Sequence, residues 1–464
     1  GAVGIVRISG PLAVNITKRS FRASRRDGKG NRKWGDDESL PRSHRVYYGN
    51  VVDYEEQVLD EVVLLIPMLA PRSYTREDVI EFHCHGGRVC LQRVLERCLQ
   101  LGARLARPGE FTFRAYLNGR IDLSQAESIG QLINAKTVGA ADSALAGLSG
   151  GIGAEVTSLR TELIDLMAQV EARVDFEEDV EDEIDKLEIL LRVQEMEMRM
   201  DKMLQTVKKG RLLREGFQLA LVGRPNVGKS SLLNRWCGVN RAIVTPIAGT
   251  TRDVVEAAVD IGGFPATLLD TAGIRDGENV DQVERIGVER SRAAAQEADI
   301  VVMVVDAKEG WQKEDQDVLD AIKGQGGPAI LVKNKVDTVI DDTTDSHYFS
   351  NGNVLNEFTD IVSTSALNGE GLQTLEDKVA KILTGSADDI SQSRGWAINQ
   401  RQAEALTRAG ESISRLLCLI KQEATIDMWS IDLRGAVAAL GEIKGDEVQE
   451  EMLDSIFENF CIGK

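Results

Sequence analysis

The chain has 464 residues and a formal net charge of −19, because 74 aspartate and glutamate residues outnumber 55 lysine and arginine residues. This length predicts two or three domains. The excess of acidic residues argues against diffuse electrostatic attraction as the source of affinity for nucleic acid, so an RNA partner must be bound by a local site or through a second protein. Six cysteines without short paired spacings argue against a disulfide framework or a zinc ribbon and favour a reducing compartment.

Residues 1–115 mix strand-like runs such as "VGIVRIS", "DEVVLLIPM" and "DVIEFHCH" with one helix-like run, "GRVCLQRVLERCLQLGA". This composition predicts an α+β domain. A polar segment rich in arginine and lysine, residues 19–45, interrupts the domain. We interpret it as a solvated insertion and keep contact with RNA as the alternative.

Residues 116–215 carry apolar residues at helical spacing, which predicts a helical domain. Its acidic run "DFEEDVEDEID" is interpreted as a solvated turn between two antiparallel helices, with a cation site as the alternative. Residues 216–384 alternate β runs with helical runs, the pattern of a doubly wound α/β domain. Helical spacing returns over residues 385–464, so we predict that the α/β domain is inserted into one split helical domain.

The segment "LALVGRPNVGKSSLLNRW" predicts a phosphate-binding loop, because its GxxxxGKS pattern follows a strand and opens a helix. Gly223 and Gly228 let backbone N–H groups close around phosphate oxygens. Lys229 reaches the β and γ phosphates, and Ser230 is a magnesium ligand. The alternative, a purely structural glycine turn, is disfavoured because three further motifs follow in the order that a GTPase requires.

The first two of these motifs predict a switch that senses the γ-phosphate. In "IAGTTRD", Thr250 and Thr251 lie on a loop where Thr251 can complete the magnesium coordination when a γ-phosphate is present. In "LLDTAG", Asp270 can hold the water shell of the metal, and the N–H of Gly273 can contact the γ-phosphate.

The third motif, "LVKNKVD", predicts that the base is guanine. It supplies Asn334, Lys335 and Asp337 at the end of a strand. A carboxylate at Asp337 can accept both the ring N–H and the exocyclic amine of guanine, and adenine offers no such pair of donors. The later segment "STSALNGEG" supplies a backbone turn that can cap the guanine oxygen, formed by Ser365, Ala366 and Leu367.

The motifs leave two catalytic features open. Ras-like GTPases commonly carry a glutamine after DTAG, but this chain has Ile274, which cannot orient water. Glu284 is the nearest downstream carboxylate that can polarise water, and a solvated glutamate at a helix start is the alternative. The negative charge of the transition state also needs a source of stabilisation. One hypothesis is a monovalent cation bound by the Asn226 side chain, and the alternative is an arginine, for which the candidates are Arg224, Arg252 and Arg275.

These motifs, together with "HGG", "RPGEFTFRAYLNGRIDLSQAE" and a terminal "CIGK", resemble the tRNA modification GTPases of the MnmE family, also called TrmE, over essentially the whole chain. The resemblance implies an N-terminal tetrahydrofolate-binding domain that forms a homodimer, and an inserted Ras-like α/β GTPase domain stimulated by potassium. It further implies an FAD-containing partner of the MnmG or GidA type. With this partner, the family adds a carboxymethylaminomethyl or related group to carbon 5 of the wobble uridine of certain tRNAs. The tRNA is then expected to bind mainly through the complex with the partner.

The resemblance also assigns roles by position. Glu284 matches the general base, and we add Lys229 and Cys461 as catalytic residues. Ser230 and Thr251 are expected to bind magnesium, and the positions matching the potassium site are Asn226, Thr245, Ile247 and Thr250. The residues expected to bind GTP are Asn226, Val227, Gly228, Lys229, Ser230, Ser231, Thr245, Thr250, Thr251, Asp270, Thr271, Ala272, Gly273, Asn334, Lys335, Asp337, Ser365, Ala366 and Leu367.

For 5-formyltetrahydrofolate or a related tetrahydrofolate, the matching positions are Arg7, Glu81, Arg120 and Lys464. Arg120 departs from the lysine of many relatives and changes the reach of the charge. On the strand "VIEFHCH", Glu81 shares one face with His83 and His85, and a carboxylate there can bond the amine and ring N–H of a pterin. A metal site formed by these three side chains is the less favoured alternative.

The ending "ENFCIGK" is expected to reach an N-terminal domain, that of the partner in the dimer, where Lys464 would meet the folate. Phe460 and Ile462 would anchor the tail by burying apolar surface, and Gly463 would permit a tight turn. Cys461 can act as a nucleophile on carbon 6 of the uracil if a nearby cation lowers its pKa, and a simply packed cysteine is the alternative.

The main rival is a GTP switch in ribosome assembly, as in relatives of Era and Der. Residues 386–464 hold 14 acids and 8 bases, which disfavours the basic C-terminal RNA-binding module of such proteins. A third alternative, a structural dimer whose nucleotide binding is vestigial, is disfavoured because a suitable residue occupies every position that contacts the phosphates or the base.

No apolar run suits a membrane span and no signal peptide is visible. The chain opens inside a strand pattern without Met, so we expect a missing N-terminal piece, such as a targeting sequence. The expected location is the cytoplasm if the source is bacterial, and the chloroplast stroma or mitochondrial matrix if it is eukaryotic.

Overall fold

The computed structural model describes residues 1–24, 41–175, 186–239, 257–269, 292–324, 327–339, 352–385, 395–446, 448, 450–458 and 460. Contacts divide the chain into two compact units. Unit 1 joins residues 1–130 to residues 441–464, and unit 2 is formed by residues 131–440. Residues 25–40 of the predicted insertion 19–45 and the acidic segment 176–185 lie outside the described residues, so the interpretations given to them stay predictions. Residues 21–23 are not a solvated insertion, because they form a strand of the first sheet and Phe21 is buried.

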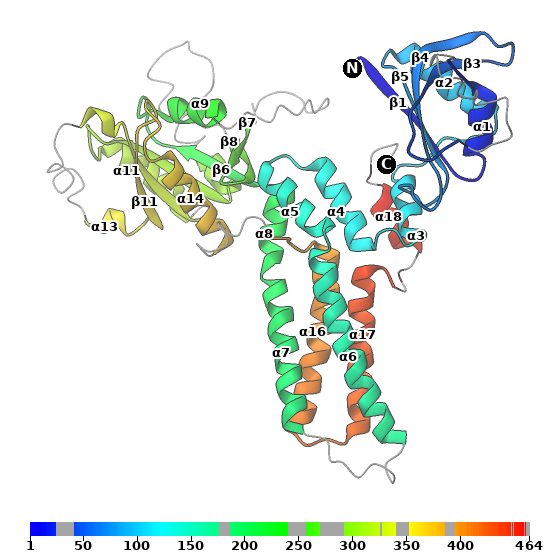
Figure 1. Cartoon of the computed structure of the whole chain (residues 1–464). Coiled ribbons are helices and arrows are strands. Elements are labelled where there is room, and N and C mark those ends of the chain that lie inside the picture. The colour runs from blue at the N-terminus through cyan, green and yellow to red at the C-terminus, as the bar shows by residue number, and fades with distance from the viewer. Residues whose placement is uncertain are drawn as a thin grey trace. The chain divides into compact units, whose positions relative to one another are not determined.

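Unit 1 is built on a five-stranded antiparallel sheet in the order β1-β5-β4-β3-β2 (Figure 1). Its strands are β1 (Val3–Ser9), β2 (Phe21–Ala23), β3 (Tyr47–Val52), β4 (Val58–Met68) and β5 (Val79–His85). Its helices are α1 (Ala13–Ser20), α2 (Arg88–Gln100), α3 (Glu110–Leu117), the start of α4 (Leu123–Asn134) and α18 (Glu450–Glu458).

The side chains of this sheet alternate between two faces, as the strand period requires. Val6, Ile8 and Phe82 point to a buried core that α1 and α2 complete. The side chains of Arg7 and Glu81 therefore belong to the opposite face, where the two residues pair across β1 and β5.

A second cluster in unit 1 contains the last described residue of the chain. Phe457 and Phe460 are buried with Leu123 and Ala126 of α4, and the Phe457 ring meets Phe113 of α3 edge to face at 5.1 Å. Phe460 is thus buried on unit 1 of its own chain. That the residues after it reach the N-terminal domain of a partner stays a prediction. Residues 461–464 lie outside the described part of the chain.

Unit 2 contains a six-stranded sheet in the order β11-β10-β9-β6-β8-β7, parallel except for the antiparallel edge strand β7. The strands are β6 (Phe217–Val222), β7 (Ala257–Ile261), β8 (Phe264–Leu269), β9 (Ile300–Asp306), β10 (Ala329–Asn334) and β11 (Asp360–Thr364). The surrounding elements are α9 (Lys229–Val239), α11 (Lys313–Ile322), η1 (Val336–Thr338), α13 (Gly352–Leu355) and α14 (Leu372–Thr384).

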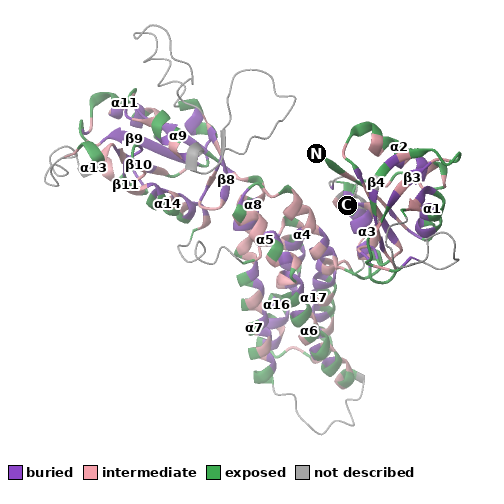
Figure 2. Ribbon diagram, turned by 45° about the horizontal axis from the view of Figure 1, so that its top comes forward, coloured by how far each residue is buried: buried purple, intermediate pink, exposed green. Residues whose placement is uncertain are grey.

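The strands of this sheet read as continuous apolar runs because both faces are covered (Figure 2). One face forms a core with α14 and the other with α11, and every residue of β9 is buried. This arrangement brings the carboxyl ends of β6, β9 and β10 to one edge of the sheet, the edge at which ligands bind in open α/β folds.

The other helices of unit 2 come from both sides of this sheet in the sequence. They are α5 (Val138–Leu148), α6 (Gly151–Asp175), α7 (Lys186–Leu204), α8 (Thr206–Glu215), α16 (Gln400–Lys421), η3 (Ile426–Met428) and α17 (Trp429–Lys444). The helices α6, α7, α16 and α17 run side by side (Figures 1 and 2), and α7 and α16 bury apolar residues at helical spacing. The multidomain α/β and helical organisation is as predicted, and the exact boundaries stay predictions.

Candidate nucleotide and ligand sites

The phosphate-binding loop connects β6 to α9, and two of its glycines have no substitute. Gly223 and Gly228 have φ angles of +143° and +100°. A Cβ on Gly223 would lie 2.3 Å from the Val304 carbonyl oxygen, and one on Gly228 would lie 2.2 Å from Asn334 Nδ2. Both positions therefore require the absence of a side chain and a backbone that glycine adopts readily.

Side chains of the predicted site lie along this loop. Lys229 is the first residue of α9, and its ammonium donates to the carbonyl oxygens of Gly223 at 2.6 Å and Arg224 at 2.7 Å. Ser230 and Ser231 follow on the exposed side of the first turn of α9, and Val227 is buried in the core. The loop thus places the lysine and the serine hydroxyls at a helix N-terminus, which suits an anionic ligand.

Asn334, the fully buried last residue of β10, joins the base motif to the phosphate loop. Its amide donates to the Val227 carbonyl oxygen at 2.9 Å, and its Oδ1 accepts from the Ala366 N–H at 3.1 Å. The Ser365 hydroxyl donates to the Asp337 carboxylate. The predicted base-binding residues from two distant segments are therefore brought together, and Leu367 lies exposed beside them.

Asp306 is a residue of this site that our sequence analysis missed. It ends β9, and its Oδ2 forms an ion pair with Lys335 Nζ at 2.7 Å. Lys335 also donates to the Asn226 carbonyl oxygen at 2.7 Å, so the base motif holds the backbone of the residue expected at the potassium site. The signal was an acid ending the buried run "DIVVMVVD", at the sheet edge where the other motifs end.

Burial by itself would raise the pKa of Asp306, but the hydrogen bond from Lys335 and those from the backbone N–H groups of Lys308 and Glu309 hold it below its usual range. The carboxylate therefore stays ionised opposite Lys335 at neutral pH.

Arg224, one of the alternatives to a bound cation, is engaged in ion pairs inside the domain. Its Nη2 lies 2.6 Å from Glu309 Oε2, and its Nε lies 3.3 Å from Asp315 Oδ2 without the alignment of a hydrogen bond. Asp315 is fully buried near the start of α11; burial raises its pKa, and Arg224 opposes that rise. Arg224 thus ties the phosphate loop to α11.

Part of the predicted GTP site lies outside the described residues. This applies to Thr245, Ile247, Thr250, Thr251, Asp270, Thr271, Ala272, Gly273 and Glu284, and also to Ile274, Arg252 and Arg275. Their roles stay predictions, as do those of Cys461, Ile462, Gly463 and Lys464 at the chain end.

In unit 1, Arg7 and Glu81 meet directly. Arg7 Nε donates to Glu81 Oε1 at 2.7 Å, and His83 Nε2 lies 3.1 Å from Glu81 Oε2. A separate pair joins His85 Nδ1 to the buried Asp60 Oδ1 at 2.7 Å. Within the described part of the chain, no three side chains of the metal-binding types gather to hold an ion, so the structure does not support the metal alternative.

Arg120 lies apart from this pair. Its Nη1 donates to the Ser73 carbonyl oxygen at 2.9 Å, and its guanidinium lies 5.9 Å from the centre of the Tyr74 ring. Arg7 lines a cavity of about 650 Å³ beside α2 and α3, whereas Arg120 lines an open depression of about 860 Å³. The structure therefore brings Arg7 and Glu81 together but sets Arg120 in a different hollow.

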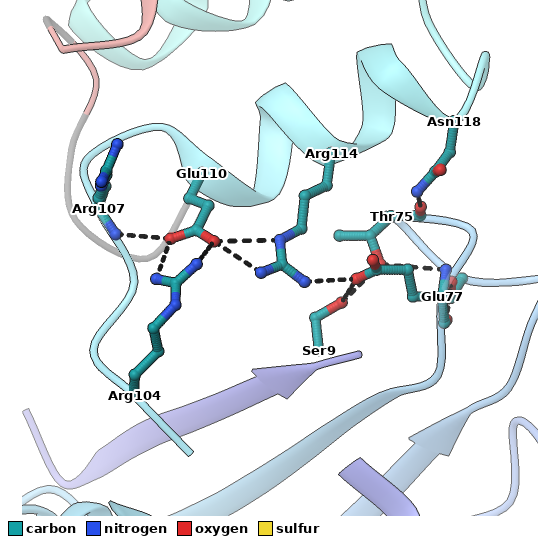
Figure 3. Close-up of polar contacts among 9 residues, drawn as sticks. Ser9, Thr75, Glu77, Arg104, Arg107, Glu110, Arg114 and Asn118 are labelled. Carbon is teal, nitrogen blue, oxygen red and sulfur yellow. Dashed lines mark hydrogen bonds and ion pairs between the residues drawn. The ribbon is translucent and has the colours of Figure 1, made fainter. Parts of the chain in front are cut away.

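A chain of ion pairs fixes α3 beside the first of these cavities (Figure 3). Glu110 accepts from Arg104, from the Arg107 N–H and from Arg114. Arg114 also donates to Glu77 at 2.9 Å. The hydrogen bond from Arg104 contributes most to lowering the pKa of Glu110 to about 2, and burial partly opposes that shift.

Comparison with known proteins covers the whole chain. Residues 123–461 match the model of the MnmE helical domain, and residues 1–120 match that of the GTP-binding protein TrmE N-terminus. The tRNA modification GTPase MnmE of Nostoc sp. (strain PCC 7120) is 48% identical over 100% of this chain and 96% of its own length. The chain belongs to the MnmE family of tRNA modification GTPases.

Other members of the MnmE family are similarly close, such as that of Synechococcus elongatus (strain PCC 7942), which is 47% identical over 100% of this chain and 96% of its own length. A solved structure of Era with MgGDPNP and nucleotides 1506–1542 of 16S ribosomal RNA is 34% identical over 36% of this chain and 56% of that chain, with a TM-score of 0.29. The end-to-end matches to MnmE proteins favour tRNA modification over the ribosome-assembly alternative.

Among the described residues, no helix is both long and apolar enough to cross a membrane.

Proposed function

We propose that this chain hydrolyses GTP with Mg²⁺ and couples the reaction to the addition of a carboxymethylaminomethyl-type group to carbon 5 of the wobble uridine of certain tRNAs, together with an FAD-containing partner of the MnmG type. Membership of the MnmE family makes the chain a GTPase of tRNA modification. The part of the proposal that concerns nucleotide binding rests on the contacts of Asn334, because its buried amide joins the phosphate loop to the turn at Ala366.

The arrangement supports guanine as the base. Asp337 lies beside Ser365, whose hydroxyl donates to one carboxylate oxygen and fixes the plane of the group. A fixed carboxylate can accept two parallel hydrogen bonds from guanine, and an unpaired one would cost about 1 to 3 kcal/mol. Specificity for GTP then follows from the penalty on any base without both donors.

We further propose that potassium binds at Asn226 and supplies the charge that an arginine would otherwise provide. Asn226 has a φ angle of +63°, which is uncommon for a residue other than glycine, and Lys335 holds its carbonyl oxygen. Arg224, the described competitor, is committed to Glu309 and Asp315. Glu284, the proposed general base, completes this mechanism.

The proposed folate site is supported by the geometry of Glu81. Arg7 places both Nε and Nη2 at 2.7 Å from Glu81 Oε1, so the carboxylate is held in one orientation. An oriented carboxylate can accept hydrogen bonds from the amine and ring N–H of a pterin. Arg120 and Lys464 would contact other parts of 5-formyltetrahydrofolate or a related tetrahydrofolate.

The proposed homodimer has a candidate surface on the sheet of unit 1. Ile5, Leu64 and Tyr48 lie in one row across β1, β4 and β3, with His83 between Ile5 and Leu64. Their exposed fractions are 51%, 41% and 47%. An apolar row on the face opposite the core is suited to burial against a second copy of the same face.

The experiment is mass spectrometry of wobble uridines from cells that lack the chain and are complemented with wild type or with Lys229→Ala. Wild type should restore the modified uridine, and the variant should not, because it loses the phosphate contact. If the uridine stays unmodified in cells complemented with either protein, the proposal is contradicted. If cells lacking the chain still modify the wobble uridine but accumulate ribosome precursors, the role in ribosome assembly is favoured.

A further inference from the structure

An open depression of about 860 Å³ in unit 1 is lined by basic side chains. We call it the arginine depression and define it by His44, Arg72, Tyr74, Arg76 and Arg120. Its walls come from the segments before β3, between β4 and β5, and after α3. No aspartate or glutamate is among the described residues that line it, although the chain as a whole carries a net charge of −19.

Two of the arginines are held in place by single backbone contacts. Arg76 Nη1 donates to the Asn118 carbonyl oxygen at 3.0 Å, and Arg120 Nη1 donates to that of Ser73 at 2.9 Å. A guanidinium has five N–H donors, so each of these contacts orients the group and leaves donors for a ligand. Arg72, Arg76 and Arg120 are all exposed.

The neighbouring acids are engaged elsewhere. Glu77 accepts hydrogen bonds from Ser9 at 2.8 Å and from Arg114 at 2.9 Å (Figure 3). Asp78 accepts from the Ala70 N–H at 3.0 Å. Glu77 is thus paired with a cation outside the depression, and neither carboxylate is among the residues that line it.

Two of the basic residues occupy backbone conformations that usually suit glycine. Arg76 has a φ angle of +59° and His44 one of +60°. A side chain in this left-handed region is strained, because its Cβ lies too close to the following carbonyl oxygen. Strained residues that persist tend to mark functional positions, and here the strain falls on two basic residues that line the same hollow.

We propose that Arg72 and Arg76 of the arginine depression bind the phosphate backbone of the tRNA on which the chain acts. An acidic chain cannot hold RNA through its overall field, so contact requires a local group of cations. Arginine is the residue best suited to phosphate, because its planar fork can donate two parallel hydrogen bonds. The inference rests on the proposed function in tRNA modification and adds a direct contact on this chain itself.

The test measures binding of a fluorescein-labelled anticodon stem–loop RNA to the full-length protein by fluorescence anisotropy over a series of KCl concentrations. The variant Arg72→Gln/Arg76→Gly removes two charges from the depression and spares Arg120, which is also in the proposed folate set. The matched control Arg88→Gln/Arg93→Gln removes two charges from exposed positions on α2. Arg76→Gly also relieves the backbone strain, so it should not lower the Tm.

We expect the depression variant to bind the RNA on the order of tenfold more weakly, and its plot of log affinity against log salt to be shallower by about 1.5 to 2, because two phosphate contacts are lost. The control should bind like wild type, and both variants should hydrolyse GTP at the wild-type rate. Restored wobble-uridine modification in cells tests the proposed function separately from this binding assay.

Wild-type affinity in the depression variant, or an unchanged salt slope, would overturn the proposal. So would a loss of 5-formyltetrahydrofolate binding with RNA binding intact, since the hollow would then belong to the folate site. Equal weakening in the control would show that the RNA responds to net charge alone and would equally overturn it.

Discussion

At the scale of single residues, the nucleotide site depends on side chains that hold one another as well as the ligand. Asn334 contacts the phosphate loop and the Ala366 turn, and Lys335 contacts Asn226 and Asp306. The motif that reads the base is therefore connected to the backbone around the phosphates. A change at either position should alter both functions.

The substitution Asp337→Asn should lower GTP affinity by about tenfold or more and allow xanthosine triphosphate to bind. The amide can donate to the oxygen that replaces the exocyclic amine of guanine, whereas the lost carboxylate can no longer accept two hydrogen bonds. Equilibrium binding of both nucleotides to wild type and variant measures the exchange. Unchanged GTP affinity would rule out this role for Asp337.

The substitution Asp306→Asn should weaken GTP binding on the order of tenfold, because Lys335 loses a charged partner that is worth more than a neutral hydrogen bond. Glu314→Gln, at an exposed position on α11, is the control and should bind GTP normally. Fluorescent GTP titration gives both values. If the two variants bind equally well, the ion pair does not position Lys335.

At the scale of elements, the sequence patterns predicted the parallel sheet and the long helices well, because each strand or helix carries its own period. They did not reveal the Lys335–Asp306 pair, since Asp306 ends β9 and Lys335 follows the neighbouring strand β10, and no local pattern encodes their meeting. The depression around Arg76 was missed for the same reason, although the similar segments "PRSHR" at 41–45 and "PRSYTR" at 71–76 carried a signal.

The position of α3 should depend on pH through Glu110. Its pKa of about 2 in the folded protein lies below the usual 4.5. Its contribution to stability is therefore complete above pH 4.5 and is lost as pH falls toward 2. We expect about 2 kcal/mol at neutral pH, a value reduced by the solvent exposure of Arg104.

Glu110→Gln should accordingly lower the Tm of the full chain at pH 7 and change it much less near pH 3. Thermal melts of wild type and variant at both pH values measure this difference. Glu96→Gln, at an exposed position on α2, serves as the control. A Tm difference that stays constant with pH would show that the ionised form of Glu110 is not what stabilises α3.

At the scale of the whole molecule, we predicted that helices before and after the α/β domain form one helical part. The packing of α7 against α16 agrees with this prediction, because the strands of the six-stranded sheet lie between these two helices in the sequence. The packing of Phe460 against α4 could not be derived from the sequence, because these residues lie far apart in the chain and meet only in the folded unit. The proposed dimer surface likewise depends on the register of four strands, which are β1, β5, β4 and β3.

The substitution Leu64→Glu should convert the proposed dimer to monomers, because it places a charge in the centre of the exposed apolar row. Val89→Glu, exposed on α2, is a matched control. Light scattering after size exclusion gives the mass of each. A variant that remains a dimer would exclude this face as the interface.

Deletion of residues 461–464 should leave GTP hydrolysis and dimerisation intact, because Phe460 remains to close the cluster with Leu123 and Ala126. It should abolish tRNA modification and weaken binding of 5-formyltetrahydrofolate, since Cys461 and Lys464 are lost. Isothermal titration and analysis of wobble uridines measure these effects. Normal modification by the truncated protein would show that the ending has no catalytic role.

The burial of Phe457 and Phe460 against α3 and α4 has a consequence for biosynthesis. The Tyr116 hydroxyl donates to the Gly445 carbonyl oxygen across a separation of 329 residues. At ordinary translation speeds the ribosome needs roughly 15 seconds to a minute to make that stretch. During this interval, the nascent N-terminal unit exposes the apolar side chains of Leu123 and Ala126, a surface that chaperones recognise. Its folding can finish only after α18 has been synthesised and has left the ribosome.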